Sequence, residues 1–411
     1  MTSTFGWLDY SDADRRRMLE VVGLFREKGT LDELGIGTVR DTYADHFFPG
    51  TSTIQTRARY FLFIPWIYLR LEQQRIRSAD AGRWARDLQA RLVEALKAGG
   101  EVANAGLIGI DAGERLQRPP SAVYWQGLRR LGIRTINASA ERYHASLDSF
   151  YRQDRTLDRS EGGELLERAP RNWNGSLPAA PENFLETTTF RLTSDEAEFL
   201  AEQIRRSAPN SLLAQCLGGV ITRVRSSRAP WELGGIERLD QTLRDDIEDA
   251  RRFSLVMEGA AFAYNLMMAE ASIEQGIHAS TERVDRYRES LTRWADEVRG
   301  EALALRRWDL DAFWSRIETL NPDVDRGTKV FCGLWMAATI GEPRDISTRA
   351  DVRLLIRKRE RQKKGALARL SNHRALERWS GESGLGRLIY RWGNAQRNLI
   401  DILDGLRAET D

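Results

Sequence analysis

The residues best suited to bind another molecule lie near the C-terminus, at 352–370, which read VRLLIRKRERQKKGALARL. Residues 344–378 contain twelve Lys or Arg and four Asp or Glu, a local charge of +8 in a chain whose formal net charge is +2. Such a concentrated basic helix is typical of proteins that bind phosphate backbones. The candidate nucleic-acid-binding residues of this segment are Arg353, Arg357, Lys358, Arg359, Arg361, Lys363 and Lys364.

The same segment has a second interpretation within the chain itself. No residue from 357 to 364 is apolar, so we expect this part of the helix to have no buried face and to be solvated or matched to an anion. The rest of the chain carries a net charge of −6, because the local +8 exceeds the total of +2. An acidic surface of the same chain is therefore the alternative partner.

A second candidate surface lies at 118–134, RPPSAVYWQGLRRLGIR. We expect Ser121 to cap a short helix and Gly132 to end it in the left-handed conformation. A short helix that ends in Leu-Gly-Ile before an extended turn is typical of winged-helix recognition helices. The alternative is an ordinary capped structural helix. The residues that would face the DNA groove are Gln126, Arg129 and Arg130.

Catalytic chemistry has one weak candidate, the pair Arg40 and His46. Their spacing fits the Arg-x4–6-His pattern of helical, metal-independent ribonucleases, in which His acts as the acid–base group beside an Arg that steadies the phosphate. With so many arginines, chance alone produces such a pair. We therefore assign no catalytic residue and keep this enzyme as an alternative function.

Metal and cofactor sites are not expected. Glu141 and His144 have the spacing of a carboxylate-bridged di-iron helix, but no second Glu-x-x-His exists to complete such a site. Two cysteines, Cys216 and Cys332, are too few for a cysteine-based zinc site and lie in apolar surroundings typical of reduced core thiols. Phosphate-cradling glycine motifs and the G-x-S-x-G motif are also absent from the sequence.

Composition favours a soluble, cytoplasmic protein that does not enter the membrane. Lysine occurs six times, so 56 of the 62 basic residues are arginine, and acidic residues nearly balance them. The N-terminus lacks the order of a signal peptide, and the longest apolar run, 60–69, is too short to span a bilayer and contains a proline.

Apolar residues recur with helical spacing along most of the chain, which predicts an all-α fold in two or three helical subdomains. We expect a loop at 41–50, a helix that starts near 51–53 and kinks at Pro65, and short alternating segments at 107–110 and 187–192. Thr193 and Glu196 have capping-box spacing. The other predicted helices are 11–28, 79–98, 121–131, 136–152, 193–206, 235–274, 281–300, 309–320, 325–340, 349–370 and 393–408.

Glycine- and proline-rich breaks indicate the order of the domains. The N-terminal domain can include a small winged-helix-like element near 107–135. The predicted ranges are an N-terminal helical domain at 1–158, a linker or surface excursion at 159–190, a central helical domain at 191–345 and a C-terminal basic helical region at 346–411.

The phrase TRARYFLFIPWIYLRLE places Arg57 and Arg59 beside a helical apolar face. We expect these arginines to pair with Asp41 or Asp45 in the preceding segment, and the alternative is phosphate binding.

Several phrases together carry a family resemblance: FGWLDYS, FFPGTSTIQTRARYFLFIPW, PPSAVYWQGLRRLGI, RRFSLVMEGAAFAYNLMMAE and YRWGNAQRNLIDIL. The chain resembles an uncharacterised family of bacterial proteins of about 400 residues, a domain of unknown function. The resemblance implies genes in clusters similar to mobile defence islands, beside helicases or nucleases, and it transfers no catalytic residue.

The hypothesis that follows is a non-catalytic accessory protein that binds nucleic acid, partner proteins or both in a bacterial multi-gene system such as an anti-phage defence system. A protein–protein scaffold without nucleic-acid affinity is a further alternative beside the ribonuclease.

Overall fold

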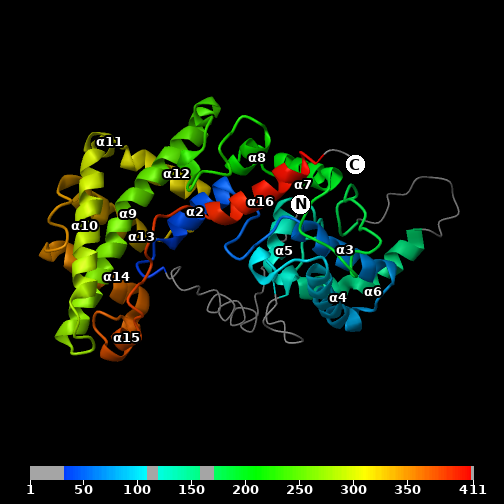
Figure 1. Ribbon diagram of the computed structural model, residues 1–411, viewed down its shortest axis with the longest axis horizontal. Helices are drawn as coiled ribbons and strands as arrows, with labels where there is room; N and C mark the ends of the chain where they lie inside the picture. Colours follow the sequence, from blue (N-terminus) through cyan, green and yellow to red (C-terminus); the bar gives the residue numbers. More distant parts are fainter. Residues whose placement is uncertain (1–31, 109–118, 158–170, 409–411) are drawn as a thin grey trace, which may run out of the picture. The chain divides into compact units, whose positions relative to one another are not determined.

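The computed structural model describes the chain in three stretches, residues 32–108, 119–157 and 171–408. The regular elements of these residues are helices, and the described stretches contain two isolated β-bridges but no strand. The prediction of an all-α fold is confirmed (Figure 1).

Two compact units make up the chain, each from two separate stretches of sequence. The first unit comprises residues up to Thr42 together with Asp249–Leu388, and the second comprises Tyr43–Glu248 together with Ile389–Asp411. These limits differ from the consecutive domain ranges that the glycine- and proline-rich breaks predict. A break in local composition does not show which distant segments pack together. A unit built from two separate stretches therefore cannot be predicted from such breaks.

The core of the first unit lies where three helices pack together, namely α9 (Gln241–Glu274), α10 (Glu282–Gly300) and α13 (Arg326–Gly341). The indole N–H of Trp294 donates to the backbone oxygen of Leu255 at 2.8 Å. The indole N–H of Trp335 donates to the backbone oxygen of Val256, also at 2.8 Å. Gly259 permits this close approach, because a Cβ atom there would lie 2.2 Å from Trp294. The helices that form this unit are α9 (Gln241–Glu274, from residue 249 on), α10 (Glu282–Gly300), α11 (Ala302–Arg306), α12 (Leu310–Leu320), α13 (Arg326–Gly341), α14 (Ala350–Lys364), η5 (Gly365–Leu367) and α15 (His373–Glu377).

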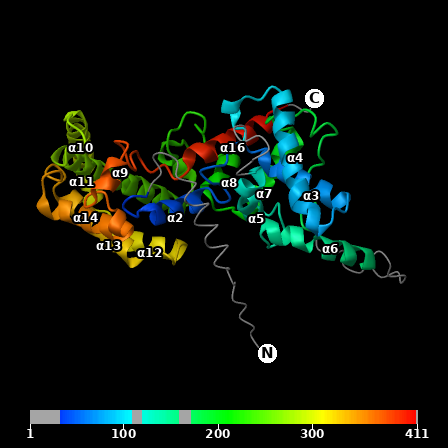
Figure 2. The same cartoon turned by 90° about the horizontal axis from the view of Figure 1, so that it is seen from below.

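The second unit is built around α3 (Tyr60–Gln73), of whose fourteen residues ten are buried. Pro65 lies inside this helix, as predicted, and the rings of Phe63 and Trp66 pack on Phe184 with centroids 5.6 and 5.1 Å away. The other helices are α2 (Gly37–Phe47, from residue 43 on), α4 (Ser78–Ala98), η1 (Ala103–Ala105), α5 (Pro120–Arg130), α6 (Ala140–Leu157), α7 (Ser194–Ser207), α8 (Leu212–Leu217), η3 (Pro230–Glu232), η4 (Ile236–Arg238) and α16 (Trp392–Gly405). Figure 2 shows α3 and α4 close together, with α5 and α6 beside them.

The predicted loop at 41–50 is wrong, because α2 continues through it to Phe47. Tyr43 and Phe47, four residues apart, are both fully buried, so packing favours the helix where polar neighbours suggest a loop. The predicted helix start near 51–53 is also wrong, since α3 begins at Tyr60. Thr51 instead donates its hydroxyl to the backbone oxygen of Phe48 at 2.6 Å, just beyond the end of α2.

Two of the features predicted at helix ends are present. The capping box of Thr193 and Glu196 is present, with each side chain bonded to the other's backbone N–H. Gly132 adopts a φ of +69°, as predicted for a helix stop. The predicted cap at Ser121 is wrong: α5 begins one residue earlier, and the backbone N–H of Ser121 donates to the side chain of Gln89 at 2.8 Å.

Neither alternating segment, 107–110 or 187–192, forms a strand in the part that the structure describes. Arg134, at the end of the predicted winged-helix-like region near 107–135, makes an isolated antiparallel bridge with Trp173, which lies outside that region. Residues 109–118 of the predicted region lie outside the described residues. The helix predicted at 11–28 and the first part of the predicted linker, 159–170 of 159–190, lie outside the described residues.

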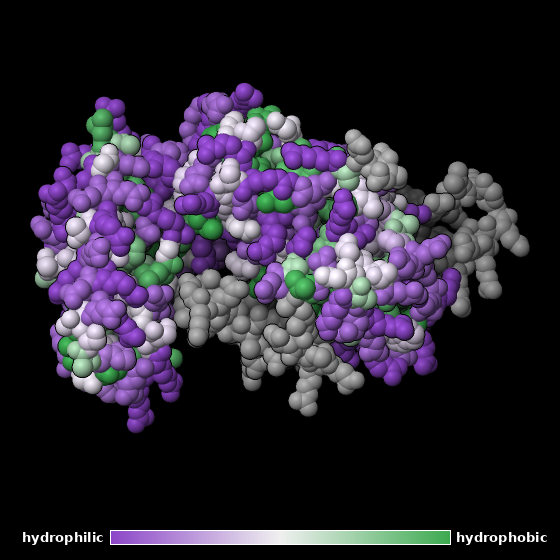
Figure 3. Space-filling model, viewed as in Figure 1, coloured by the Kyte–Doolittle hydropathy of each residue, from purple (hydrophilic) through white to green (hydrophobic). Residues whose placement is uncertain are grey.

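The molecular face in Figure 3 is hydrophilic over most of its area, with apolar residues in small separated groups. Among the described residues, no helix is both long enough and apolar enough to cross a membrane. Cys216 and Cys332 are buried and free, and burial raises the pKa of each thiol, that of Cys216 to about 12.

Candidate nucleic-acid interface

Residues 352–364 of the predicted basic segment lie in α14 of the first unit, which ends at Lys364, earlier than the predicted helix 349–370. Val352 and Ile356, one turn apart, are buried and pack the N-terminal half of the helix onto the unit. The guanidinium carbon of Arg359 lies 5.5 Å from the ring centre of Phe331 in α13. Gly365, with a φ of +54°, follows the last residue of α14.

Arg359 and Glu360 are 2% and 0% exposed, so the expectation that this part of the helix has no buried face is wrong. The Nε of Arg359 donates to the backbone oxygen of Leu34 at 2.7 Å. Its Nη2 donates to the backbone oxygen of Gly35 at 3.0 Å and to the hydroxyl of Thr328 at 2.8 Å. Burial lowers the pKa of Arg359. A charged side chain can thus be buried when its donors are satisfied, which residue type alone does not reveal.

Lys364 belongs to a buried cluster of charges. It contacts the carboxylates of Glu33 and Glu360, the latter at 3.6 Å, and Arg369 donates to Glu33 at 2.8 Å. Tyr264 donates its hydroxyl to Glu360 at 2.5 Å. Burial and the neighbouring carboxylate raise the pKa of Tyr264. Two carboxylates and two cations balance within the cluster, so Lys364 has an internal role.

Two further basic residues of α14 pair with carboxylates of the first unit. Arg353 lies 2.6 Å from Glu270, and Lys363 lies 3.2 Å from Asp325. Hydrogen bonds from Thr328, together with Lys363, lower the pKa of Asp325 to about 2. The alternative that this helix pairs with acidic residues of the same chain is therefore confirmed for Arg353, Lys363 and Lys364.

The three remaining cations of α14 form an exposed group. Arg357, Lys358 and Arg361 are solvent-exposed, and the described residues provide no ion-pair partner for any of them. Because Arg361 follows the other two by three and four residues, all three lie on one side of the helix. Leu354, 50% exposed, precedes Lys358 by one turn on the same side. We call Arg357, Lys358 and Arg361 the basic face of α14.

The second predicted surface belongs to α5 of the second unit. Gln126, Arg129 and Arg130 are all exposed, and spacings of three and four residues place them on one side of the helix. Tyr124 and Leu128 on the opposite side are fully buried. The helix therefore has the burial pattern of both interpretations, a recognition helix and an ordinary structural helix.

The two residues of the ribonuclease alternative each contact a carboxylate. Arg40, in the first unit, pairs with its neighbour Asp41 at 3.0 Å. In the second unit, the Nε2 atom of His46 lies 2.8 Å from the carboxylate of Asp246, which is 2% exposed.

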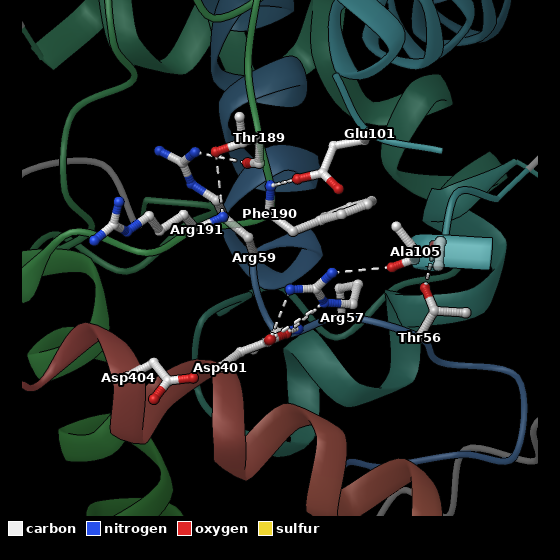
Figure 4. A network of polar contacts seen from close by, with 12 residues as sticks. Thr56, Arg57, Arg59, Glu101, Ala105, Thr189, Phe190, Arg191, Asp401 and Asp404 are labelled. Atoms are coloured by element: carbon white, nitrogen blue, oxygen red, sulfur yellow. Dashed lines mark hydrogen bonds and ion pairs between the residues drawn. The ribbon is translucent and has the colours of Figure 1, made fainter. Parts of the chain in front are cut away.

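Arg57 pairs with a carboxylate that sequence reasoning did not suggest (Figure 4). Its Nε and Nη2 atoms contact the carboxylate of Asp401 in α16 at 2.8–3.2 Å, and its Nη1 donates to the backbone oxygen of Ala105 at 2.9 Å. The expected pairing with Asp41 or Asp45 is wrong, because the actual partner is 344 residues away in sequence.

Arg59 also has a distant partner. Its Nε and Nη2 atoms donate to both oxygens of Glu196 at 2.9 and 2.7 Å, and its Nη1 donates to the backbone oxygen of Thr189 at 2.7 Å. Glu196 is also the third residue of α7 and forms its capping box with Thr193. Both side chains are less than a tenth exposed, so this bidentate pair fixes the start of α3 to α7 inside the second unit.

Sequence reasoning missed the role of α16, which supplies donors to the backbone of surrounding loops. Asn394 donates to the backbone oxygens of Thr53 and Gln55 at 3.1 and 2.7 Å. The indole N–H of Trp392 donates to the backbone oxygen of Ser227 at 3.0 Å. The signal for this role is the run of polar residues in YRWGNAQRN at the start of a helix that is otherwise apolar on one side.

Among the described residues, no three His, Cys, Asp or Glu side chains form a group that could hold a metal ion. His144, the candidate beside Glu141, stacks on Tyr68 with ring centres 5.7 Å apart. Burial lowers the pKa of His144, which favours its neutral form.

The fold and the candidate site define a helical protein with two compact units and an exposed basic face on one helix. The chain belongs to a family of unknown function, DUF6361, whose model matches residues 2–405. Neither the curated proteins nor the solved structures include a match to this chain.

Proposed function

We propose that this chain is a non-catalytic accessory protein that binds nucleic acid through the basic face of α14. The observation that carries the proposal is the contrast within one helix. Arg359 and Lys364 are engaged inside the first unit, whereas Arg357, Lys358 and Arg361 are exposed without a carboxylate partner among the described residues. Cations that no carboxylate neutralises keep their attraction for phosphate.

In this proposal the protein acts in the bacterial cytoplasm within a multi-gene system such as an anti-phage defence system, beside protein partners from neighbouring genes. Resemblance to a bacterial family supports this setting, and co-purification with the products of adjacent genes tests it. The exposed residues of α5, namely Gln126, Arg129 and Arg130, are proposed as a second surface for the same ligand.

The test is binding of the full chain to labelled duplex DNA and to RNA of equal length over a series of salt concentrations. We expect Arg357→Gln, Lys358→Gln and Arg361→Gln, changed together, to weaken binding. They should reduce the slope of log K against log salt for the duplex by about 2.7, at about 0.9 for each phosphate that the variant no longer neutralises. Lys364 is left unchanged, because its replacement would disturb the buried cluster with Glu33.

The matched control removes three positive charges elsewhere. Arg83→Gln, Arg205→Gln and Arg206→Gln change exposed arginines that already pair with Asp80 or Glu202, and they should leave the slope nearly unchanged. A slope that is the same in the α14 variant as in the unmodified chain would rule out the basic face. A separate variant that combines Arg129→Gln and Arg130→Gln measures how much α5 contributes to nucleic-acid binding.

A further inference from the structure

Helix α13 is apolar on both of its sides. Its inner side contains Phe331, Trp335 and Met336, all buried. Its outer side contains Val330 and Leu334, which are 50% and 54% exposed. No residue from 330 to 341 is charged. A helix that is apolar all round is usually covered on all sides, so the outer side indicates an interaction surface.

The outer side of α13 also has room for a close neighbour. Ala337 and Gly341 are exposed and lie on the same side as Leu334, at three and seven residues from it. A Cβ atom at Gly333 or Gly341 would meet nothing within 4 Å. Small residues of this kind let another helix approach closely.

We propose that the outer side of α13 binds the same side of α13 in a second copy of this chain, with the two helices antiparallel. A two-fold symmetric pair requires a self-complementary surface. In one antiparallel register each Leu334 lies against Ala337 of the other copy, and each Val330 lies against Gly341. Large side chains then fill the space above small ones, as in packed helix pairs.

The charges at the two ends of α13 fit the same arrangement. Arg326 and Lys329 lie in its first turn, whereas Glu342 directly follows its last residue and is exposed. Antiparallel helices place the first turn of one copy beside the end of the other, and in the stated register Lys329 lies opposite Glu342. Opposite charges therefore meet at both ends, and the helix dipoles are also aligned favourably.

The test is sedimentation velocity of the full chain over a wide range of concentrations. We expect a concentration-dependent dimer, and we expect Leu334→Glu to raise its dissociation constant at least about tenfold, because a buried unpaired charge opposes association. The control Leu367→Glu introduces the same charge at a 69% exposed leucine outside α13 and should leave the dimer unchanged. Circular dichroism melting verifies that both variants are folded.

Charge reversal tests the antiparallel register. Lys329→Glu and Glu342→Lys should each weaken the dimer, and the combined variant should restore it, because the opposite charges again face each other. Lys329 also pairs with Glu318 at 2.7 Å within the same copy. Glu318→Gln removes only this internal pair, so it serves as the control for the loss of that pair in the combined variant. A chain that is monomeric at all concentrations, or a dimer that Leu334→Glu leaves unchanged, would overturn the proposal. Failure of the combined variant to restore the dimer would overturn it as well.

Discussion

The guanidinium group of Arg57 makes three hydrogen-bond contacts of 2.8–3.2 Å with the carboxylate of Asp401, 344 residues further along the chain. The same carboxylate accepts the backbone N–H of Ala58 at 2.9 Å. The segment before α3 is therefore fixed to α16 by one side chain, and this contact joins two distant stretches of the second unit.

Asp401→Asn should lower the free energy of unfolding by about 3 kcal/mol, because it leaves a mostly buried guanidinium without its counter-charge. The matched control is Asp404→Asn on the same helix, whose pair with Arg225 is exposed, so a loss below about 1 kcal/mol is expected. Urea denaturation measures both values. Equal losses would contradict the assigned importance of the buried pair.

Two arginines of α14 that are two residues apart should differ in their effect on stability. Arg359→Ala removes donors to two backbone oxygens and a hydroxyl and leaves a cavity, so a loss of about 2–4 kcal/mol is expected. Arg361→Ala removes an exposed side chain and should change stability by less than about 0.5 kcal/mol. Urea denaturation compares the two. A stable Arg359→Ala variant would show that the buried contacts are dispensable.

Stability should depend on Asp325 in acid. Its pKa is lowered to about 2 in the folded chain, from an ordinary value near 4, so the unfolded chain binds the proton more readily. The stabilisation is fully present above about pH 4 and is lost as the pH falls toward 2. Thermal melting from pH 5 to pH 2 should therefore show a smaller loss for Asp325→Asn than for the unmodified chain. Equal losses of melting temperature in the two proteins would contradict the predicted contribution of Asp325.

The ribonuclease alternative predicts cleavage of RNA, whereas the proposed function predicts binding without cleavage. A non-catalytic protein should leave labelled RNA intact during prolonged incubation, and His46→Ala should make no difference. Gel electrophoresis of the RNA measures this. Cleavage by the unmodified chain that disappears in both His46→Ala and Arg40→Gln would instead favour the enzyme.

The candidate site could be predicted only in part. The sequence identified the basic segment at 352–370 and the alternative of internal pairing. It could not sort the cations, because the contacts that bury Arg359 come from residues 34, 35 and 328, and the partner of Lys364 is Glu33. An exposed and a buried arginine have the same local sequence signal until the chain has folded.

The sequence by itself determined features that depend on neighbours within a few residues. Helical periodicity predicted the all-α class, the spacing of Thr193 and Glu196 predicted their capping box, and Gly132 predicted a left-handed stop. Each follows from backbone geometry and hydrogen bonds over three or four residues. Only the tertiary structure decided the partners of Arg57 and Arg59, because ion pairs between distant segments depend on which helices pack together.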